Sequence, residues 1–338
     1  MIRSAKGSAL GRPRKGLTLT ALAAAALLTL AACSEGGAPP SQPEGQQGGG
    51  GGGDSGYTIA MVTHEAPGDT FWDKIRAGAE QAAKDTGAEL KYSANPQVGE
   101  QATLIQNAID SKVDGVATTL YSDALAGSVK NAQAAKIPVV GFNTGISVYQ
   151  DMGALMYFGS DEDLAGQTAG KRIADAGAKH ALCVIQEEGS LALEARCAGV
   201  KKSLANTENI QVNGRDVSAV TSSLQAKLSQ DKSIDYIVTL GAPIALAALQ
   251  SIDQSGSAAK LVTFDLNTDA AQAIKDGKIE FSIDQQPYVQ GYMAVTSLYL
   301  CLKNGNDIGG GKAVLTGPSF VDKSNIDVIL PFAQNNTR

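Results

Sequence analysis

Residues 57–92 read YTIAMVTHEAPGDTFWDKIRAGAEQAAKDTGAELKY. The segment holds a short apolar run at 57–63, an alanine-rich stretch with helical periodicity at 71–85, and a second short run at 89–92. Two such runs on either side of an amphipathic segment are typical of two parallel strands joined by a helix. The segment therefore predicts a βαβ unit, from which α/β sheets are built.

The same alternation continues along the chain. We expect further strands at 115–120, 138–142, 181–186, 210–216, 236–240, 260–264 and 279–283, and helices at 100–112, 124–135, 164–176, 193–205, 222–229, 244–254, 269–275 and 288–303. Because the pattern restarts after Gly159, two similar α/β units follow one another. The body of about 280 residues also exceeds what one core commonly organises, which favours two lobes.

The N-terminal segment predicts a secretory leader. Its first 32 residues combine five basic residues and no acid with an apolar run from Leu17 to Leu30, too short to span a bilayer comfortably. Leu30-Ala31-Ala32-Cys33 resembles a bacterial lipobox, which implies cleavage before Cys33 and its acylation. A plain signal peptide with an incidental cysteine is the alternative. Residues 36–56 are rich in Gly, Pro, Ser and Gln and predict a flexible linker.

Charge and motif content exclude several classes of protein. Five of the 28 basic residues and none of the 34 acidic residues lie in the leader, so the mature chain carries a net charge of −11. No cluster of Lys and Arg with interleaved aromatic residues occurs, which argues against nucleic acid. We find no nucleophile elbow, Walker loop, dinucleotide fingerprint or His-Glu-x-x-His motif. We therefore expect neither an enzyme nor a cofactor or metal.

Polar and aromatic side chains follow the predicted strands. They are His64, Glu65, Phe71, Trp72, Tyr121, Asn143, Ser160, Asp161, Glu187, Asp265, Asn267, Asp284, Gln285 and Gln286. Open parallel sheets bind ligands at the carboxyl ends of their strands, so the cleft between two facing sheets is the expected site. The set holds no obvious nucleophile with a base, which favours binding over catalysis.

From about Tyr57 onwards the chain resembles the ribose- and galactose-type sugar-binding proteins of ABC importers, the type I periplasmic binding proteins. The resemblance rests on the order and spacing of DTFW (69–72), IPVVGFN (137–143), GSD (159–161), RCAGV (196–200), TFD (263–265), DGKI (276–279) and DQQPY (284–288). It implies two Rossmann-like lobes with parallel sheets, joined by a three-strand hinge and closing over one sugar. The expected lobes are 57–159 with 286–318, and 160–285 with 319–338.

The resemblance implies roles for individual residues. Phe71 and Trp72 match an aromatic pair that packs on the sugar ring, with ordinary core residues as the alternative. Arg196 matches an arginine that serves ligand oxygens, with an ion pair to Glu187 or Glu194 as the alternative.

Two more matches lie in the second half of the chain. Asp265 matches an acid that accepts hydrogen bonds from adjacent hydroxyls, and Gln285 a hinge-side glutamine. The predicted ligand-binding set is thus His64, Phe71, Trp72, Tyr121, Asn143, Arg196, Asp265, Asn267 and Gln285. We expect Asp265→Ala and Arg196→Ala to abolish binding while the melting temperature of the unliganded protein stays unchanged.

The chain departs from the family at two places. Asn143-Thr144 stands where members often have Asp before Arg, and Leu240-Gly241-Ala242-Pro243 where members often have Asn-Asp. Both departures leave the identity of the ligand open.

Three cysteines follow Cys33. Outside the cytosol, Cys183 and Cys197 can pair, because a strand and the first turn of the next helix bring such positions together. Two buried free thiols are the alternative. Cys301 is predicted to be a small core residue.

These features predict a monomeric, extracytoplasmic lipoprotein, held at the membrane through Cys33. It would capture a monosaccharide and deliver it to an ABC permease. Two alternatives stay open: a binding protein for a non-sugar polyol such as inositol or for a furanosyl autoinducer, and an accessory protein that presents ligand to a sensor kinase. Repressors of the same fold need an N-terminal DNA-binding module, and the leader and linker occupy that place here.

Overall fold

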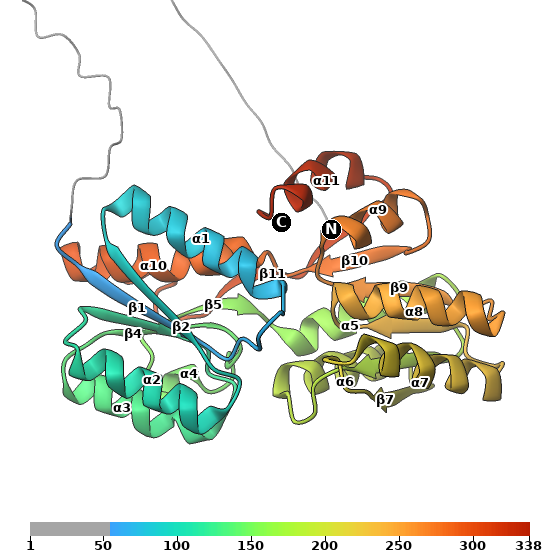
Figure 1. Cartoon of the computed structure of the whole chain (residues 1–338), viewed down its shortest axis with the longest axis horizontal. Helices are drawn as coiled ribbons and strands as arrows, with labels where there is room; N and C mark the ends of the chain where they lie inside the picture. The colour runs from blue at the N-terminus through green and yellow to red at the C-terminus, as the bar shows by residue number, and fades with distance from the viewer. Residues whose placement is uncertain (1–54) are drawn as a thin grey trace, which may run out of the picture. The chain divides into compact units, whose positions relative to one another are not determined.

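A computed structural model describes residues 55–338 and places their strands in two six-stranded sheets (Figure 1). The predicted leader, Cys33 and nearly all of the predicted linker lie outside the described residues. Within residues 55–338, none of the helices has the length and apolar character that crossing a membrane requires.

The first sheet has the strand order β11-β5-β4-β3-β1-β2, and every neighbouring pair is parallel. Its strands are β1 (Thr58–Thr63), β2 (Glu89–Ala94), β3 (Gly115–Thr118), β4 (Val139–Asn143), β5 (Met156–Ser160) and β11 (Val314–Gly317). The helices that go with it are α1 (Phe71–Thr86), α2 (Val98–Asp110), the 3₁₀ turn η1 (Asp123–Leu125), α3 (Ala126–Ala134), α4 (Tyr149–Met152) and α10 (Pro287–Asn304).

The second sheet repeats this arrangement with the order β12-β10-β9-β8-β6-β7. Its strands are β6 (Ala181–Ile185), β7 (Thr207–Gln211), β8 (Tyr236–Thr239), β9 (Lys260–Phe264), β10 (Phe281–Asp284) and β12 (Ser319–Asp322). Only the β10–β12 pair is antiparallel. The helices that pack beside the second sheet are α5 (Glu162–Asp175), α6 (Leu191–Ser203), α7 (Val217–Gln230), α8 (Ala242–Ser255), α9 (Thr268–Lys275) and α11 (Ile326–Gln334).

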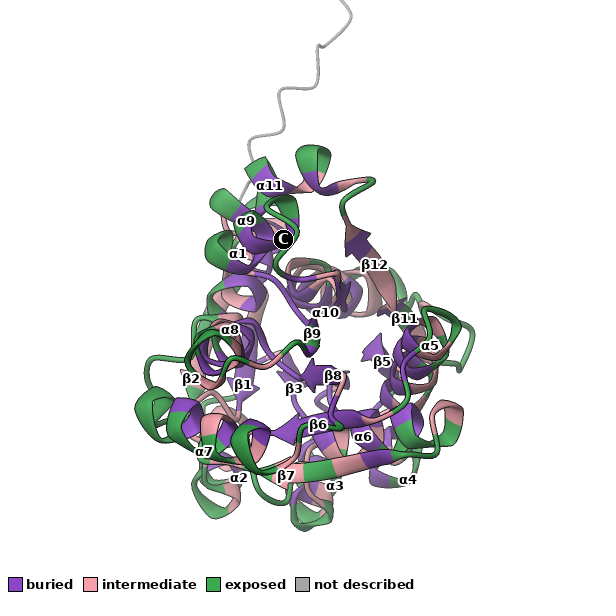
Figure 2. Cartoon of the chain, turned by 90° about the vertical axis from the view of Figure 1, so that its right-hand side faces the viewer, coloured by how far each residue is buried: buried purple, intermediate pink, exposed green. Residues whose placement is uncertain are grey.

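The inner strands are buried on both faces, as parallel sheets between helices require. In β6, Leu182 and Val184 join one apolar cluster, whereas Cys183 and Ile185 join another on the opposite face. Figure 2 shows the inner strands in the buried colour and the edge strand β7 partly exposed. Each sheet is therefore the middle of three layers.

Glycine pairs let two helices approach each other closely in each half. A Cβ atom on Gly78 of α1 would overlap the carbonyl oxygen of Tyr288 in α10, and one on Gly291 would overlap that of Ile75. Gly166 of α5 and Gly199 of α6 make the matching approach beside the second sheet. Helices α5 and α10 each follow a strand of one sheet and pack against a helix of the other, so they tie the two halves together.

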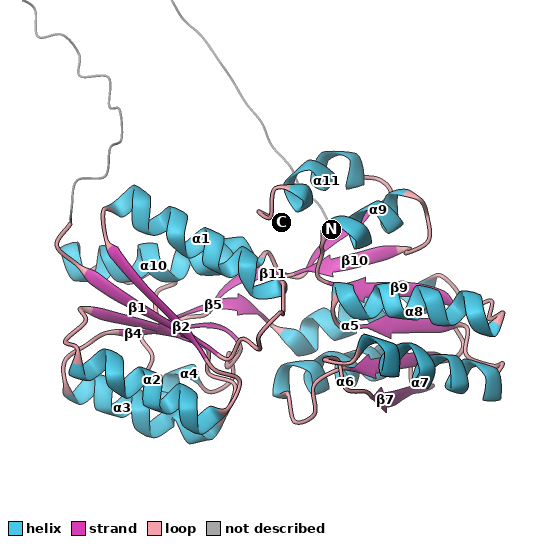
Figure 3. Ribbon diagram, viewed as in Figure 1, coloured by secondary structure: helices cyan, strands magenta, loops and turns pink. Residues whose placement is uncertain are grey.

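The chain passes between the sheets three times: after β5 at residues 160–161, after β10 at 284–287, and between β11 and β12 at 317–319. The carboxyl ends of the two sheets face each other, as the arrowheads of β5 and β10 show (Figure 3). Side chains that follow β4 and β9 contact the second crossover, as described below.

The predicted α/β fold with two parallel sheets is confirmed. The strand expected at 210–216 was misplaced, because β7 covers Thr207–Gln211 and residues 212–216 lead into α7. Edge strands such as β7 alternate buried and exposed side chains and so lack a continuous apolar run. The resemblance implied a three-strand hinge, but the apolar pattern did not indicate β5, β11 and β12 as strands, nor α4 and α11 as helices.

Candidate functional site

Two residues with left-handed backbone end matching strands of the two sheets. Asn143 ends β4 with φ 65°, and Asp265 follows β9 with φ 61°. Strands β4 and β9 hold the same place in their sheets, between β3 and β5 and between β8 and β10. Asn and Asp tolerate this backbone better than most residues. Both side chains are buried, at 6% and 8% exposure.

A chain of hydrogen bonds links these two residues across the second crossover. Asn143 Nδ2 donates to Gln285 Oε1 at 3.2 Å, and Gln285 Nε2 donates to Asp265 Oδ1 at 2.9 Å. Arg196 continues the chain, with Nη1 3.7 Å from Asp265 Oδ2. The structure thus brings together four of the predicted site residues, from both sheets and the hinge.

Arg196 is ion-paired, but with neither of the expected acids. Its Nε donates to Glu162 Oε2 at 2.5 Å and its Nη1 donates to the carbonyl oxygen of Leu240 at 3.2 Å. Arg196 and Glu162 are 4% and 6% exposed, and the other oxygen of Glu162 has no hydrogen-bond partner within residues 55–338. Removal of Arg196 would leave a buried carboxylate unpaired. This buried ion pair argues against the expectation that removal of Arg196 leaves the unliganded fold intact, and we expect a loss of stability instead.

Four aromatic side chains lie together at the ends of β1 and β3. The His64 ring centroid is 4.7 Å from that of Trp72 and 4.5 Å from that of Tyr121, and Phe71 meets Trp72 edge-on at 5.3 Å. Trp72 is 4% exposed and belongs to the core cluster around Ile59, whereas the other three are half-buried. Phe71, His64 and Tyr121 thus keep the surface that a ligand would need.

His64 and Glu65 do not form an acid–base pair. His64 Nδ1 lies 2.8 Å from Thr119 Oγ1, and burial lowers the pKa of His64 to about 3, so the ring is neutral at physiological pH. The Glu65 carboxylate instead accepts hydrogen bonds from Arg76 Nη2 and, at 2.7 Å, from the Tyr92 hydroxyl. His64 therefore serves as a neutral hydrogen-bonding group.

Asn267 has a structural task. Its Oδ1 accepts a hydrogen bond from the Ala270 amide at 2.8 Å, which caps helix α9. Only the Nδ2 group of this half-buried residue remains for a ligand. The structure also joins Cys183 of β6 to Cys197 of α6 in a disulfide bond, beneath the first turns of α6.

Sequence reasoning missed three buried polar residues beside this series of hydrogen bonds: Lys74, Gln290 and Thr316. Gln290 Nε2 donates to Gln285 Oε1 and to Thr316 Oγ1, at 3.0 and 3.1 Å, and Lys74 lies in the first turn of α1. Lys74 is 3% exposed and Gln290 is fully buried. The one sequence signal that could have placed Gln290 at the site is its position one helical turn after Gln286, on the same side of the helix. Nothing in the local sequence distinguishes Lys74 from an exposed lysine.

Asp265 should make stability depend on pH. Burial raises the pKa of Asp265 from its ordinary value of 3.8 to about 7, with Arg196 and Gln285 opposing the shift. A carboxyl group with a raised pKa in the folded state contributes stability that is complete below about pH 4 and is lost as pH rises through 7. His64, whose pKa is lowered from 6.5, acts in the opposite sense between about pH 3 and 6.5.

The comparison of the parent with Asp265→Asn isolates the carboxyl group. Relative to this variant, we expect the parent to lose up to about 1.4 kcal/mol of unfolding free energy per pH unit between pH 4 and 7. Urea unfolding at a series of pH values measures the difference. Parallel stability curves for the two proteins would contradict the raised pKa.

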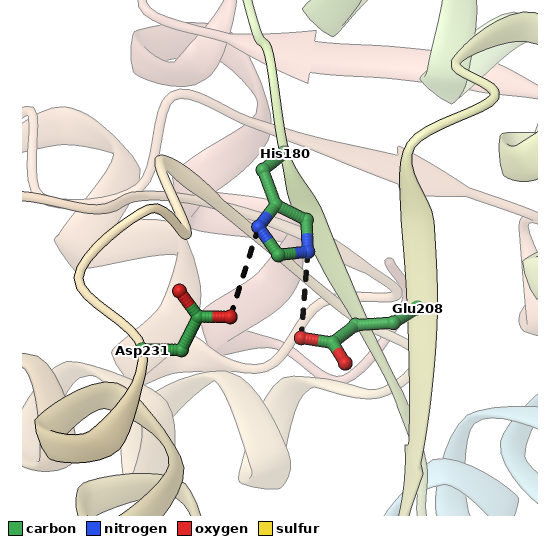
Figure 4. A group of neighbouring side chains, drawn as sticks. All are labelled: His180, Glu208 and Asp231. Atoms are coloured by element: carbon green, nitrogen blue, oxygen red, sulfur yellow. Dashed lines mark ion pairs between the residues drawn. The ribbon is translucent and has the colours of Figure 1, made fainter.

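A second group of titratable side chains lies away from this site. His180 is flanked by Glu208, 3.4 Å from Nε2, and by Asp231, 3.9 Å from Nδ1 (Figure 4). One ring nitrogen of His180 and one oxygen of each carboxylate lie within 4.8 Å of one another, and His180 Nδ1 lies 2.8 Å from Ser233 Oγ. Lys227 Nζ already lies 2.8 Å from Glu208. Because Lys227 and Ser233 already bond to these groups, we interpret the arrangement as a polar network that joins β6, β7 and the end of α7.

Comparison with known proteins identifies the type of molecule. A family described as periplasmic binding protein domain matches residues 59–307. The xylose/arabinose-binding protein XylF of Sulfolobus acidocaldarius is 26% identical over 67% of this chain and 61% of its own length. The ribose import binding protein RbsB of Salmonella typhimurium is 28% identical over 68% of this chain and 79% of its own. These relatives are binding proteins and not enzymes.

One solved structure is much more similar in sequence. A carbohydrate transporter from Acidothermus cellulolyticus, in complex with myo-inositol, is 51% identical, with a TM-score of 0.82. The match covers 83% of this chain and 99% of the other. A solute-binding protein from Burkholderia graminis with bound D-arabinose, 23% identical over 81% of this chain and 98% of its own with a TM-score of 0.72, shares the fold.

Proposed function

This chain belongs to the type I periplasmic binding proteins, and on that premise we propose that it binds a ring-shaped polyol outside the cytoplasm and delivers it to an ABC permease. It is a binding protein and not an enzyme. We further propose that Cys33 is acylated and anchors the mature protein to the membrane, through the linker that follows it. The protein would act as a monomer and without nucleic acid or cofactor.

The observation that carries this proposal is the buried polar chain Asn143–Gln285–Asp265–Arg196 beside the aromatic side chains of His64, Phe71 and Tyr121. A ring polyol has an apolar C–H face and a rim of hydroxyls. The aromatic rings suit the face, and the carboxylate and guanidinium suit the rim. Planar groups with several donors and acceptors fit neighbouring hydroxyls on a rigid ring.

For the ligand we propose a cyclic polyol of the myo-inositol class. The support is the 51% identity to a protein whose structure contains myo-inositol, compared with 26–28% to the ribose- and xylose-binding relatives. The sequence alone ranked a monosaccharide first and inositol second, so the comparison reverses that order. A monosaccharide, as bound by the more distant relatives, is the second candidate.

We propose that residues 57–159 with 286–318 and residues 160–285 with 319–338 move as two lobes. The three crossovers at residues 160–161, 284–287 and 317–319 would form the hinge. Binding would favour the closed arrangement, because only that arrangement brings ligand contacts from both lobes together.

A thermal-shift panel tests the ligand class. At a myo-inositol concentration of about one hundred times Kd, we expect the melting temperature to rise by roughly 5 to 10 °C, because binding to the folded state stabilises it in proportion to ln(1 + [L]/Kd). The acyclic polyol mannitol is the control, and D-ribose, D-xylose and D-glucose represent the second candidate. No shift with any ring polyol would overturn the proposed function. Fluorescence of Trp72, the only tryptophan, gives an independent readout.

Delivery needs a separate experiment. Uptake of labelled ligand should fall in a strain that lacks this protein if it serves a permease. Unchanged uptake, together with a lost transcriptional response to the ligand, would favour presentation to a sensor kinase.

A further inference from the structure

Five charged residues are buried in the described chain, and all of them adjoin the proposed site: Lys74, Glu162, Arg196, Asp265 and Asp284. Glu162 and Asp265 share Arg196. Asp284 is fully buried and accepts a hydrogen bond from Arg338 Nε at 2.5 Å. Four of the five therefore have an ionic partner. Lys74 is the exception.

The Lys74 ammonium makes no hydrogen bond or ion pair with any described residue, although the residue is only 3% exposed. An ion pair would place Nζ within 4.0 Å of a carboxylate oxygen, so every carboxylate of residues 55–338 lies farther away than that. The Nζ atom is not among the fully buried atoms that lack a partner, so the ammonium keeps a small accessible surface while the rest of the side chain is enclosed. Holding a charge there without a partner is costly. This unfavourable free energy leads us to look for a functional role of the Lys74 ammonium.

The fold places this ammonium at the hinge side of the site. Lys74 lies in the first turn of α1, two residues after Trp72. The close approach of α1 to α10 at Gly78 and Tyr288 sets this turn beside the crossover that leads into α10. The carboxylates that act most strongly on Lys74 are Asp265 and Asp284, both from the second sheet.

Lys74 also balances the charge of the site. Once Asp265 is ionised, above its raised pKa of about 7, three buried carboxylates face the guanidinium groups of Arg196 and Arg338, which without Lys74 leaves one negative charge in excess. With Lys74 included, the three negative charges are matched by three positive charges. A site of zero net charge suits an uncharged ligand. No ion pair within 4.0 Å joins Lys74 to Asp265, whereas one hydroxyl that bridges an amine and a carboxylate separates them by about 4.5–5 Å.

We propose that Lys74 is a ligand-binding residue whose ammonium donates a hydrogen bond to a hydroxyl that in turn donates to Asp265. This inference rests on the proposed function, and it assigns a ligand contact to the first turn of α1 in addition to Phe71. A hydroxyl in this place accepts from one charged group and donates to another, and such charge-assisted bonds are the strong ones. The site would thereby discriminate against analogues that lack this hydroxyl.

The test measures affinity and stability together in the full-length protein. Lys74→Met keeps the length of the side chain and removes the charge. Isothermal titration calorimetry with myo-inositol should give an affinity at least about tenfold weaker, because a lost charge-assisted bond weakens binding by this factor or more. The melting temperature of the unliganded variant should equal or exceed that of the parent, since a buried unpaired charge has been removed.

Lys84→Met is the matched control, because Lys84 lies exposed on the same helix. It should change neither affinity nor melting temperature. Binding of Lys74→Met within twofold of the parent would overturn the inference, and so would a melting temperature far below the parent, which would assign the ammonium to the fold. A parent that binds no ring polyol in the panel would instead refute the proposed function.

Discussion

Replacement of Arg196 by methionine is expected to lower the free energy of unfolding of the unliganded protein by about 3–5 kcal/mol, and to abolish ligand binding. Arg196 is 4% exposed, and its Nε is the ionic partner of Glu162 Oε2 at 2.5 Å. The other oxygen of Glu162 already has no hydrogen-bond partner within residues 55–338, so the variant would bury a wholly unpaired carboxylate. Urea unfolding measures the stability, and calorimetry measures the binding.

Two variants separate charge from packing. Lys202→Met removes an exposed ion pair with Asp163 that joins the same two helices, and should cost less than about 1 kcal/mol. The double variant Glu162→Gln with Arg196→Met should recover much of the lost stability, because it removes both buried charges. If Arg196→Met is as stable as the parent, the Glu162–Arg196 pair does not stabilise the fold, and the assignment fails.

Asp265→Asn is expected to weaken binding of the ligand by about 100-fold or more. Hydrogen bonds to a charged acceptor contribute about 1.5–3 kcal/mol each, and a carboxylate between two hydroxyls accepts two. Asparagine tolerates the left-handed backbone at φ 61°, so the change removes the charge without adding backbone strain. Alanine at this position would remove the charge and also strain the left-handed backbone, so the two effects on affinity could not be separated.

The control for this variant is Asp269→Asn, an exposed acid in the first turn of α9. It should leave the affinity of the protein unchanged. Calorimetry with myo-inositol at pH 8, above the raised pKa of Asp265, compares the two variants with the carboxylate ionised. Equal affinities for the parent and Asp265→Asn would remove Asp265 from the site.

Much of the fold could be predicted from the sequence because its elements have strong local signals. Strand β1 has an apolar centre from Ile59 to Val62, and α1 has the periodicity of a helix buried on one face. The strands β11 and β12 have no such signal, since they are four residues long and only partly buried. They form because the hinge holds them against β5 and β10.

The candidate site was predicted only in part. Asn143 and Asp265 could be found because they follow buried strands whose carboxyl ends face the other sheet. The partner of Arg196 could not, because Glu162 lies 34 residues away and meets it through the close packing of α5 on α6 at Gly166 and Gly199. Lys74 has the same local surroundings in sequence as an exposed lysine, yet it is 3% exposed in the folded protein, where α1 packs closely on α10.

By itself the sequence determined that two α/β units follow one another and which residues end their strands, because periodicity and burial along one element are local properties. The tertiary structure alone decided which charges meet: Glu162 pairs with Arg196 and Arg338 with Asp284, whereas Lys74 has no ionic partner among residues 55–338. Charge pairing depends on distances of a few ångströms between elements far apart in the chain. Those distances are set by how closely the helices pack, which no local pattern encodes.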